Sequence, residues 1–137
     1  MSETPFAMPG VTAHLTIGDG KAADAIDFYK AAFGATEQTR HMAEDGVRIM
    51  HAHLIINDGP LMLNDHFHEM TAGEPVPPPA GTTLHLEVDN ADAWWSRALD
   101  AGAKVRFPLD NQFWGARYGQ LIDPFGHVWS IGGPIRA

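Results

Sequence analysis

The order of strand-like and helix-like segments in this 137-residue chain occurs twice, and this internal repeat constrains the fold more than any other feature. In the first half, a strand-like segment at 11–17 precedes residues 22–33, whose apolar side chains recur at helical spacing, and three more strand-like segments follow. In the second half, a strand at 82–88 and a helix at 91–101 are followed in the same order by three further strands. Each half is therefore predicted to form a β-α-β-β-β module.

A proline-rich segment separates the two halves. Prolines 75, 77, 78 and 79 cannot lie in a helix or a central strand, and they favour a stiff, extended connection. We therefore assign module one to 11–69, a linker to 70–81 and module two to 82–133. A chain of this length can bury one sizeable core, so residues 1–137 are expected to form a single domain of the α+β class.

The charge balance excludes several classes of partner. Nine basic against 17 acidic residues give a net charge of -8, which repels phosphate backbones and anionic lipids. We expect no binding to nucleic acid and none to membranes, since no apolar run approaches the ~20 residues that span a bilayer. The first residues lack the features of a secretory signal, so the expected location is cytoplasmic.

The residue types available limit the chemistry. The chain has no cysteine, which excludes disulfides, thiolate catalysis and cysteine zinc sites. It also has no glycine-rich phosphate loop and no nucleophile elbow, and Ser2, Ser96 and Ser130 have no evident base partner in the sequence. Histidine, carboxylate and hydroxyl chemistry remain.

Four segments resemble a known family. The segments 17–20 and 25–34 resemble the first strand and helix of the vicinal-oxygen-chelate superfamily, which includes glyoxalases, bleomycin-resistance proteins and dioxygenases. The segment 112–129 resembles its closing hairpin, and 51–65 resembles its PhnB-like branch. This resemblance, which covers roughly 11–133, implies two tandem β-α-β-β-β modules that form a curved mixed sheet around a cleft for a small molecule. It also implies a homodimer, as do the adjacent Trp94 and Trp95, which cannot both face one sheet.

The same resemblance implies four positions for a divalent metal. Aligning residues 17–18 with 88–89, a shift of 71, pairs Thr12 with Thr83, and aligning Gly59 with Gly126, a shift of 67, pairs Leu63 with Ser130. These four residues are the implied metal positions. None of them is a histidine or a glutamate, and hydroxyl groups are weak ligands. We therefore expect no metal ion among these four side chains.

Stronger chemical groups lie two residues further along three of those strands. Strand alternation predicts that His14, Asp65 and His85 face the same side as the four implied positions, and we name these three as catalytic candidates. Three alternatives stay open: a divalent metal at this shifted site, a metal-free acid–base group, or structural histidines bonded to neighbouring backbone. The cofactor is thus undetermined.

Five further residues are candidates for ligand binding. His51 and His53 share one strand face and are expected to line the cleft, although they could be ordinary strand residues. Glu87 lies two residues after His85 and is expected to face the same side of its strand. It is either a carboxylate of the cleft or a solvated acid at the strand end. Phe113 and Trp114 lie in a glycine-containing loop, where they either cap the cleft or pack against the other module or a dimer mate.

Two functional hypotheses follow. The first is an enzyme-like cleft that acts on an unknown small molecule with its histidines, without the usual set of metal ligands. The second is a non-catalytic protein of the resistance type that sequesters a small molecule. Whether the chain is an enzyme stays open.

Overall fold

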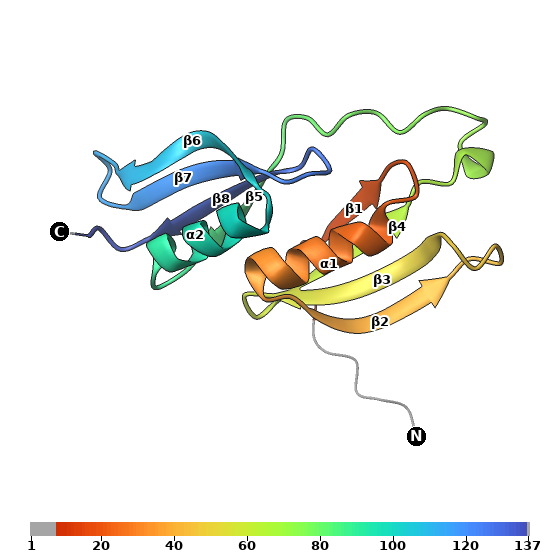
Figure 1. Cartoon of the computed structure of the whole chain (residues 1–137), viewed down its shortest axis with the longest axis horizontal. Helices are drawn as coiled ribbons and strands as arrows, with labels where there is room; N and C mark the ends of the chain where they lie inside the picture. The colour runs from red at the N-terminus through yellow and green to blue at the C-terminus, as the bar shows by residue number, and fades with distance from the viewer. Residues whose placement is uncertain (1–7, 137) are drawn as a thin grey trace, which may run out of the picture.

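Each half of the chain forms a four-stranded mixed sheet with one helix packed against it (Figure 1). The computed structural model describes residues 8–136. The first half comprises β1 (Ala13–Ile17), α1 (Ala22–Phe33), β2 (Thr36–Met42), β3 (Ile49–Ile56) and β4 (Gly59–Asp65), followed by the short 3-10 helix η1 (His68–Met70). The second half comprises β5 (Thr83–Glu87), α2 (Ala91–Ala101), β6 (Lys104–Asn111), β7 (Arg117–Ile122) and β8 (Val128–Gly133).

The two sheets have the same topology. Their strand orders are β1-β4-β3-β2 and β5-β8-β7-β6, so each sheet has its first and last strands side by side. These two strands are parallel in each sheet, and the other pairs are antiparallel. The predicted α+β fold of two tandem β-α-β-β-β modules is confirmed.

Local sequence signals set the ends of the helices. Helix α1 is followed by Gly34 with a left-handed φ of 67°, a conformation that glycine adopts without steric cost. Helix α2 begins after Asn90, whose side-chain oxygen accepts a hydrogen bond from the amide of Ala93 at 3.1 Å. Gly102 ends this helix in the same way as Gly34 ends α1.

Each sheet has one face toward its helix and one face away from it. Strand alternation directs Leu15, Ile17, Leu54 and Leu63 toward α1, where all four are buried. We call the opposite side of each sheet its open face, because most side chains there are exposed or half-buried. Helices α1 and α2 contact each other, so the two open faces point away from a shared layer of helices (Figure 1).

The contact between the modules is a polar centre within an aromatic cluster. The Tyr29 hydroxyl of α1 donates a hydrogen bond of 2.6 Å to Asp123 of the second module. The indole nitrogen of Trp129 donates to the same carboxylate at 2.9 Å, and the Trp129 ring lies 4.7 Å from that of Phe33. Burial and the negative charge of Asp123 raise the pKa of Tyr29 well above its usual value, so its hydroxyl stays protonated and donates. These contacts join the two halves into one core.

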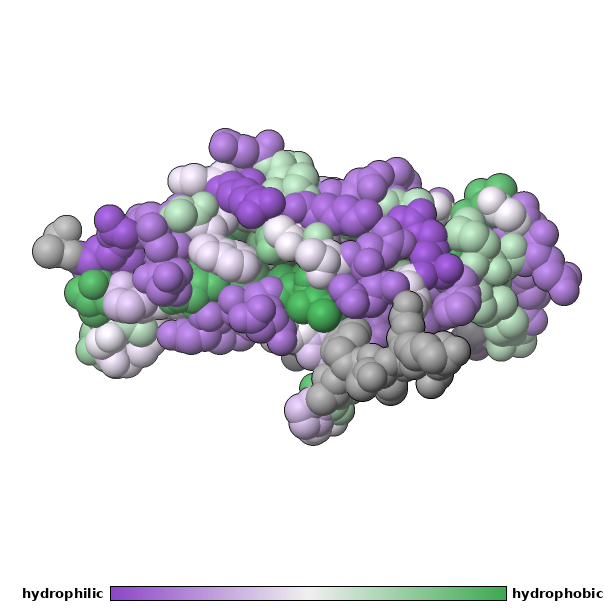
Figure 2. Space-filling view, turned by 90° about the horizontal axis from the view of Figure 1, so that it is seen from below, coloured by the Kyte–Doolittle hydropathy of each residue, from purple (hydrophilic) through white to green (hydrophobic). Residues whose placement is uncertain are grey.

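The remaining surface is largely polar. The proline-rich segment 74–80 has neither helix nor strand and runs between η1 and β5. Within residues 8–136, no helix is both long and apolar enough to cross a membrane. Figure 2 shows a mostly hydrophilic face on which hydrophobic residues gather in small, separated groups.

Candidate functional site

The strand register shows that one of the four implied metal positions was wrongly assigned. In β4, Leu63 is paired with Leu15 and is fully buried against α1, whereas Ser130 of β8 is paired with His85 on the open face. The residue of β4 equivalent to Ser130 is Met62, which is paired with His14.

A difference in turn length explains this error. The pair Ile55 and Pro60 encloses residues 56–59, whereas the pair Ile122 and Val128 encloses residues 123–127. The second turn is one residue longer, so β4 and β8 align with a shift of 68 residues, from 62 to 130, rather than 67. A shift of one residue moves every side chain to the other face of a strand.

The same error affects Asp65, which lies on the helix side and not with His14. Its carboxylate is fully buried and accepts hydrogen bonds from the amides of Ala22 at 2.9 Å and Ile49 at 2.6 Å. The predicted shared face is therefore wrong for this residue. Asp65 connects β4 to the first turn of α1 and to the start of β3.

Four histidines gather on the open face of the first sheet. His51 lies at the centre, with its ring 5.9 Å from His14, 6.4 Å from His41 and 6.4 Å from His53. His14 Nε2 also lies 2.6 Å from the side-chain oxygen of Asn64. We call His14, His41, His51 and His53 the histidine face.

Two rings of the histidine face, those of His51 and His53, favour the neutral form. Partial burial, and then the nearby His14 and His41, lower the pKa of His51. Partial burial and the neighbouring His51 lower the pKa of His53. A neutral imidazole has one donor and one acceptor nitrogen, so these two rings are suited to hydrogen bonding with an uncharged polar ligand.

On the second sheet, His85 is held at both ring nitrogens. Its Nδ1 lies 2.7 Å from Ser130 Oγ, and its Nε2 lies 2.8 Å from Glu87 Oε1. When the neutral ring carries its proton on Nε2, it donates to Glu87 and accepts from the Ser130 hydroxyl. Ser130 is only 1% exposed, whereas the Glu87 side chain is 71% exposed. Ser130 therefore orients the ring, and Glu87 can reach a ligand.

Gly132 provides the space for this pair. A Cβ atom at this position would lie 2.8 Å from His85 Cε1 and 3.1 Å from Glu87 Oε1. Any larger residue would displace the imidazole or the carboxylate. The observed arrangement of His85 and Glu87 therefore requires glycine at position 132.

Aromatic rings continue from His85 across the open face. The Tyr118 ring is nearly parallel to His85 at 6.0 Å, and it contacts Phe107 at 6.2 Å and Trp114 at 5.7 Å. Phe113 lies 5.1 Å from Trp114. Phe113 is 97% exposed and Trp114 52% exposed, so both rings are accessible. We call Phe107, Phe113, Trp114 and Tyr118 the aromatic platform.

Several of these neighbours were not predicted from the sequence. Ser130 was set aside because no base adjoins it in the sequence, but the parallel pairing of β5 with β8 brings His85 to it. Tyr118 alternates with the buried Gly119 and Leu121, so strand parity could have identified it. No sequence signal marks the place of Phe107, because β6 is irregularly paired there.

The structure assigns His14 and His85 to separate clusters. Both lie on edge strands, and a cavity of about 290 Å³ runs between β1 and β5. Across residues 8–136, no three histidine, cysteine, aspartate or glutamate side chains are placed together as a metal site would need. The corrected family positions, Thr12, Met62, Thr83 and Ser130, offer hydroxyls and a thioether. These residues do not fit the divalent metal that the fold family implies.

Comparison with known proteins agrees with this architecture. Residues 12–131 match the model of the Glyoxalase/Bleomycin resistance protein/Dioxygenase superfamily. An uncharacterized protein of Mycobacterium bovis is 47% identical over 132 residues, which cover 93% of this chain and 85% of that protein. The crystal structure of protein PA1353 from Pseudomonas aeruginosa superposes with a TM-score of 0.71 at 25% identity, covering 93% of this chain and all of that one. The PhnB protein from Bacillus cereus, at 18% identity, has a TM-score of 0.66 and covers 92% of this chain and 98% of its own.

Proposed function

The chain belongs to the Glyoxalase/Bleomycin resistance protein/Dioxygenase superfamily, and from this premise we propose that it binds a small molecule on its open faces and acts on it through Glu87 and His85. The observation that carries this proposal is the double restraint on His85, by Ser130 at Nδ1 and by Glu87 at Nε2. A carboxylate oriented by an imidazole is suited to general acid–base chemistry.

The proposed proton transfer needs only residues of this chain. Glu87 accepts a proton from the bound molecule through its exposed carboxylate, and the hydrogen bond from His85 orients that carboxylate. Ser130 keeps the ring in place because its hydroxyl is buried and bonded to Nδ1. No step passes through a metal ion, since the residues at the family's positions do not fit one.

The aromatic platform supplies the binding surface. Exposed rings of Phe113 and Trp114 offer large apolar areas with little conformational freedom to lose. Tyr118 links these rings to His85, so a planar group stacked on the platform would extend toward Glu87. We propose a ligand with a planar apolar part and an acidic or polar group at one end.

A second copy of the chain would complete the site. Within one chain the two open faces point away from the helices and do not enclose a ligand (Figure 1). We propose a homodimer in which the histidine face of one copy covers the aromatic platform of the other. Light scattering at micromolar concentration should then give twice the chain mass of 14.9 kDa. A mass of one chain would refute this arrangement.

Membership of the PhnB-like branch and a cytoplasmic location are also proposals. The first is supported by the segment 51–65, which follows the pattern of that branch. The second stays a prediction from the sequence.

A turnover screen tests the proposed activity. The wild-type protein and His85→Gln and Glu87→Gln variants would be incubated with a panel of small aromatic and oxygenated metabolites and followed by proton NMR. Conversion by the wild type that both variants lose supports the proposal. The matched control is Glu44→Gln, because Glu44 is an exposed carboxylate on the chain segment between β2 and β3. Conversion that survives in both site variants would refute it.

A sequestering protein is the second candidate. The exposed aromatic platform favours it, because stacking requires no proton transfer. In this case, panel compounds would quench Trp114 fluorescence without being converted, and His85→Gln would bind them as well as the wild type does. A Trp114→Phe variant lacks the fluorescence of this residue, so comparison with the wild type separates the Trp114 signal from that of the other three tryptophans.

A further inference from the structure

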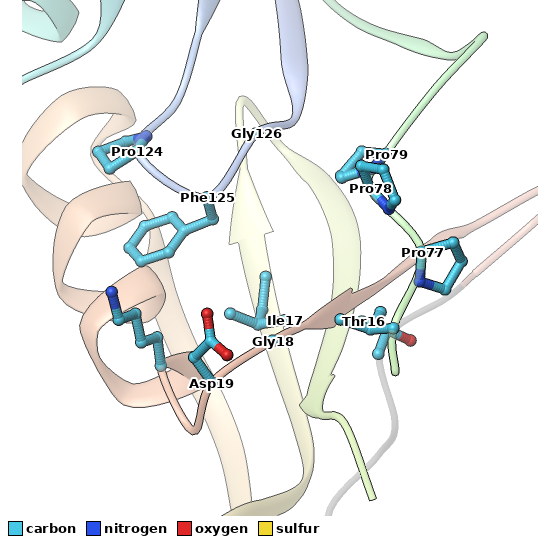
Figure 3. Close-up of a pocket in the computed structure, with 12 residues that line it drawn as sticks. Thr16, Ile17, Gly18, Asp19, Pro77, Pro78, Pro79, Pro124, Phe125 and Gly126 are labelled. Carbon is cyan, nitrogen blue, oxygen red and sulfur yellow. The ribbon is translucent and has the colours of Figure 1, made fainter. Parts of the chain in front are cut away.

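A cavity of about 360 Å³ lies at the junction of the two modules, on a different part of the molecule from the site above (Figure 3). Three segments enclose it: the end of β1 with the turn into α1, the proline-rich segment 76–79, and the turn 124–126 between β7 and β8. We call it the junction cavity. Neither the histidine face, the aromatic platform nor Glu87 lines it.

Two glycines allow the proline segment to lie close to the modules. A Cβ atom on Gly18 would lie 2.8 Å from Val76 Cγ1, and one on Gly126 would lie 3.4 Å from Pro79 Cδ. Successive prolines fix their own φ angles, so this wall of the cavity has little freedom to lose when a ligand binds. The size of the cavity is within the range of sites for small molecules.

The walls are apolar, and the mouth carries both signs of charge. Phe125 and Pro77–Pro79 surround the space, and the carboxylate of Asp19 points toward it (Figure 3). Lys21 also lines the cavity. Within the described part of the chain, neither the Asp19 nor the Lys21 side chain forms a hydrogen bond or an ion pair. The cavity thus combines an apolar wall with an anionic and a cationic group that are both available.

We propose that the junction cavity binds a small zwitterion with an apolar side chain, of the α-amino-acid type. Asp19 binds the ammonium group, Lys21 binds the carboxylate, and the side chain packs against Phe125 and the prolines. The Phe125 ring is held edge-on by Phe28 at 6.2 Å and by Tyr29 at 6.5 Å, so the apolar wall is formed before the ligand arrives. A ligand here contacts both modules and would strengthen their association.

Three related probes test this proposal by calorimetry: L-phenylalanine, phenethylamine, which lacks the carboxylate, and 3-phenylpropionate, which lacks the ammonium group. L-Phenylalanine should bind most tightly. Asp19→Asn should weaken L-phenylalanine and phenethylamine by about tenfold and leave 3-phenylpropionate unchanged, because one charge-assisted hydrogen bond is lost. Lys21→Met should weaken L-phenylalanine and 3-phenylpropionate and leave phenethylamine unchanged.

Matched controls separate this effect from a general change of charge. Asp58, like Asp19, has a positive φ, which asparagine tolerates, but it lies in the turn between β3 and β4 away from the cavity. Asp58→Asn and Lys104→Met should bind all three probes as the wild type does. Amide chemical shifts should change at Gly18, Phe125 and Gly126 and not at His85 or Tyr118.

Three results would overturn the proposal: no binding of L-phenylalanine at millimolar concentration, equal losses in the control variants, or chemical shift changes on the open faces instead. The first result would mean that Asp19 and Lys21 are solvated surface charges. Because the probes and the variants differ from those of the turnover screen, failure here leaves the proposed function of Glu87 and His85 independently testable.

Discussion

The open faces of the two sheets occupy equivalent places in equivalent modules, but they carry different chemistry. His14 and His85 stand at the same position of β1 and β5, 71 residues apart. On the first sheet the strand partner of this histidine is Met62, and the ring turns to Asn64 and His51. On the second sheet the partner is Ser130, which binds the ring directly. The residue on the neighbouring strand therefore decides what a repeated histidine does.

A carboxylate near the end of a strand in each module shows a similar contrast. Asp65 of the first module points to the helix side and is fully buried, whereas Glu87 of the second module points to the open side. One carboxylate stabilises its module, and the other is available to a ligand. Four predictions test this division, in order of expected effect.

The largest effect is expected for Asp65→Ala. The change leaves the buried amides of Ala22 and Ile49 without a partner, so the free energy of unfolding should fall by about 3 kcal/mol. Glu87→Gln, which alters the exposed carboxylate, should change stability by less than about 0.5 kcal/mol. Urea denaturation measures both. If Asp65→Ala is as stable as the wild type but binds no ligand, Asp65 belongs to the site and the division is wrong.

The two tyrosines offer a matched pair for the contact between modules. Tyr29→Phe removes the hydrogen bond to buried Asp123 and should lower the free energy of unfolding by about 2 kcal/mol. Tyr118→Phe removes only the bond that the Tyr118 hydroxyl accepts from Gln120 on the open face, so its effect should stay below about 0.5 kcal/mol. Thermal melts of the two variants compare them directly, and equal melting temperatures would contradict the assigned role of Tyr29.

The equivalent histidines should respond differently to truncation. His85→Ala leaves the Ser130 hydroxyl buried without its partner, which should reduce the free energy of unfolding by about 1 kcal/mol. His14→Ala leaves the half-buried side chain of Asn64, whose amide still donates to the Asp65 carbonyl, so its stability should stay close to that of the wild type. Ligand binding should suffer more in His85→Ala. Identical stability and binding in both variants would show that the two faces are equivalent after all.

The smallest expected effect is the pH dependence of folding stability that His51 and His53 cause. His51 and His53 have pKa values below the ordinary histidine value of 6.5. Between pH 6.5 and these lower values, the folded protein therefore binds fewer protons than the unfolded chain. Unfolding then takes up protons, and the contribution of these residues to stability is complete above pH 6.5 and decreases as the pH falls below it. NMR titration of the ring protons should give pKa values below 6.5 for both His51 and His53. The variant His51→Asn should raise the pKa of His53, because it removes a neighbouring charge. A higher than ordinary pKa for either ring would contradict this account.

Several features of the fold were predictable from the sequence because they depend on neighbouring residues. The helical spacing of Ile26, Tyr29 and Phe33, and the glycines that end both helices, act within a few positions of the chain. Alternation in β5 placed His85 and Glu87 on one side, and the structure agrees. The repeated order of these local signals was enough to predict two β-α-β-β-β modules.

Only the tertiary structure decided which distant residues meet. The turn between β7 and β8 is one residue longer than the turn between β3 and β4, so β4 and β8 align differently from the prediction. In the observed register Leu63 and Asp65 face the helix, and Met62 lies on the open face. The bonds of Ser130 to His85 and of Asp123 to Tyr29 join positions 45 and 94 residues apart. Strand pairing and the packing of the two modules create these contacts, so no local pattern records them. The sequence by itself determined the modules, and the register between their strands determined the chemistry of each face.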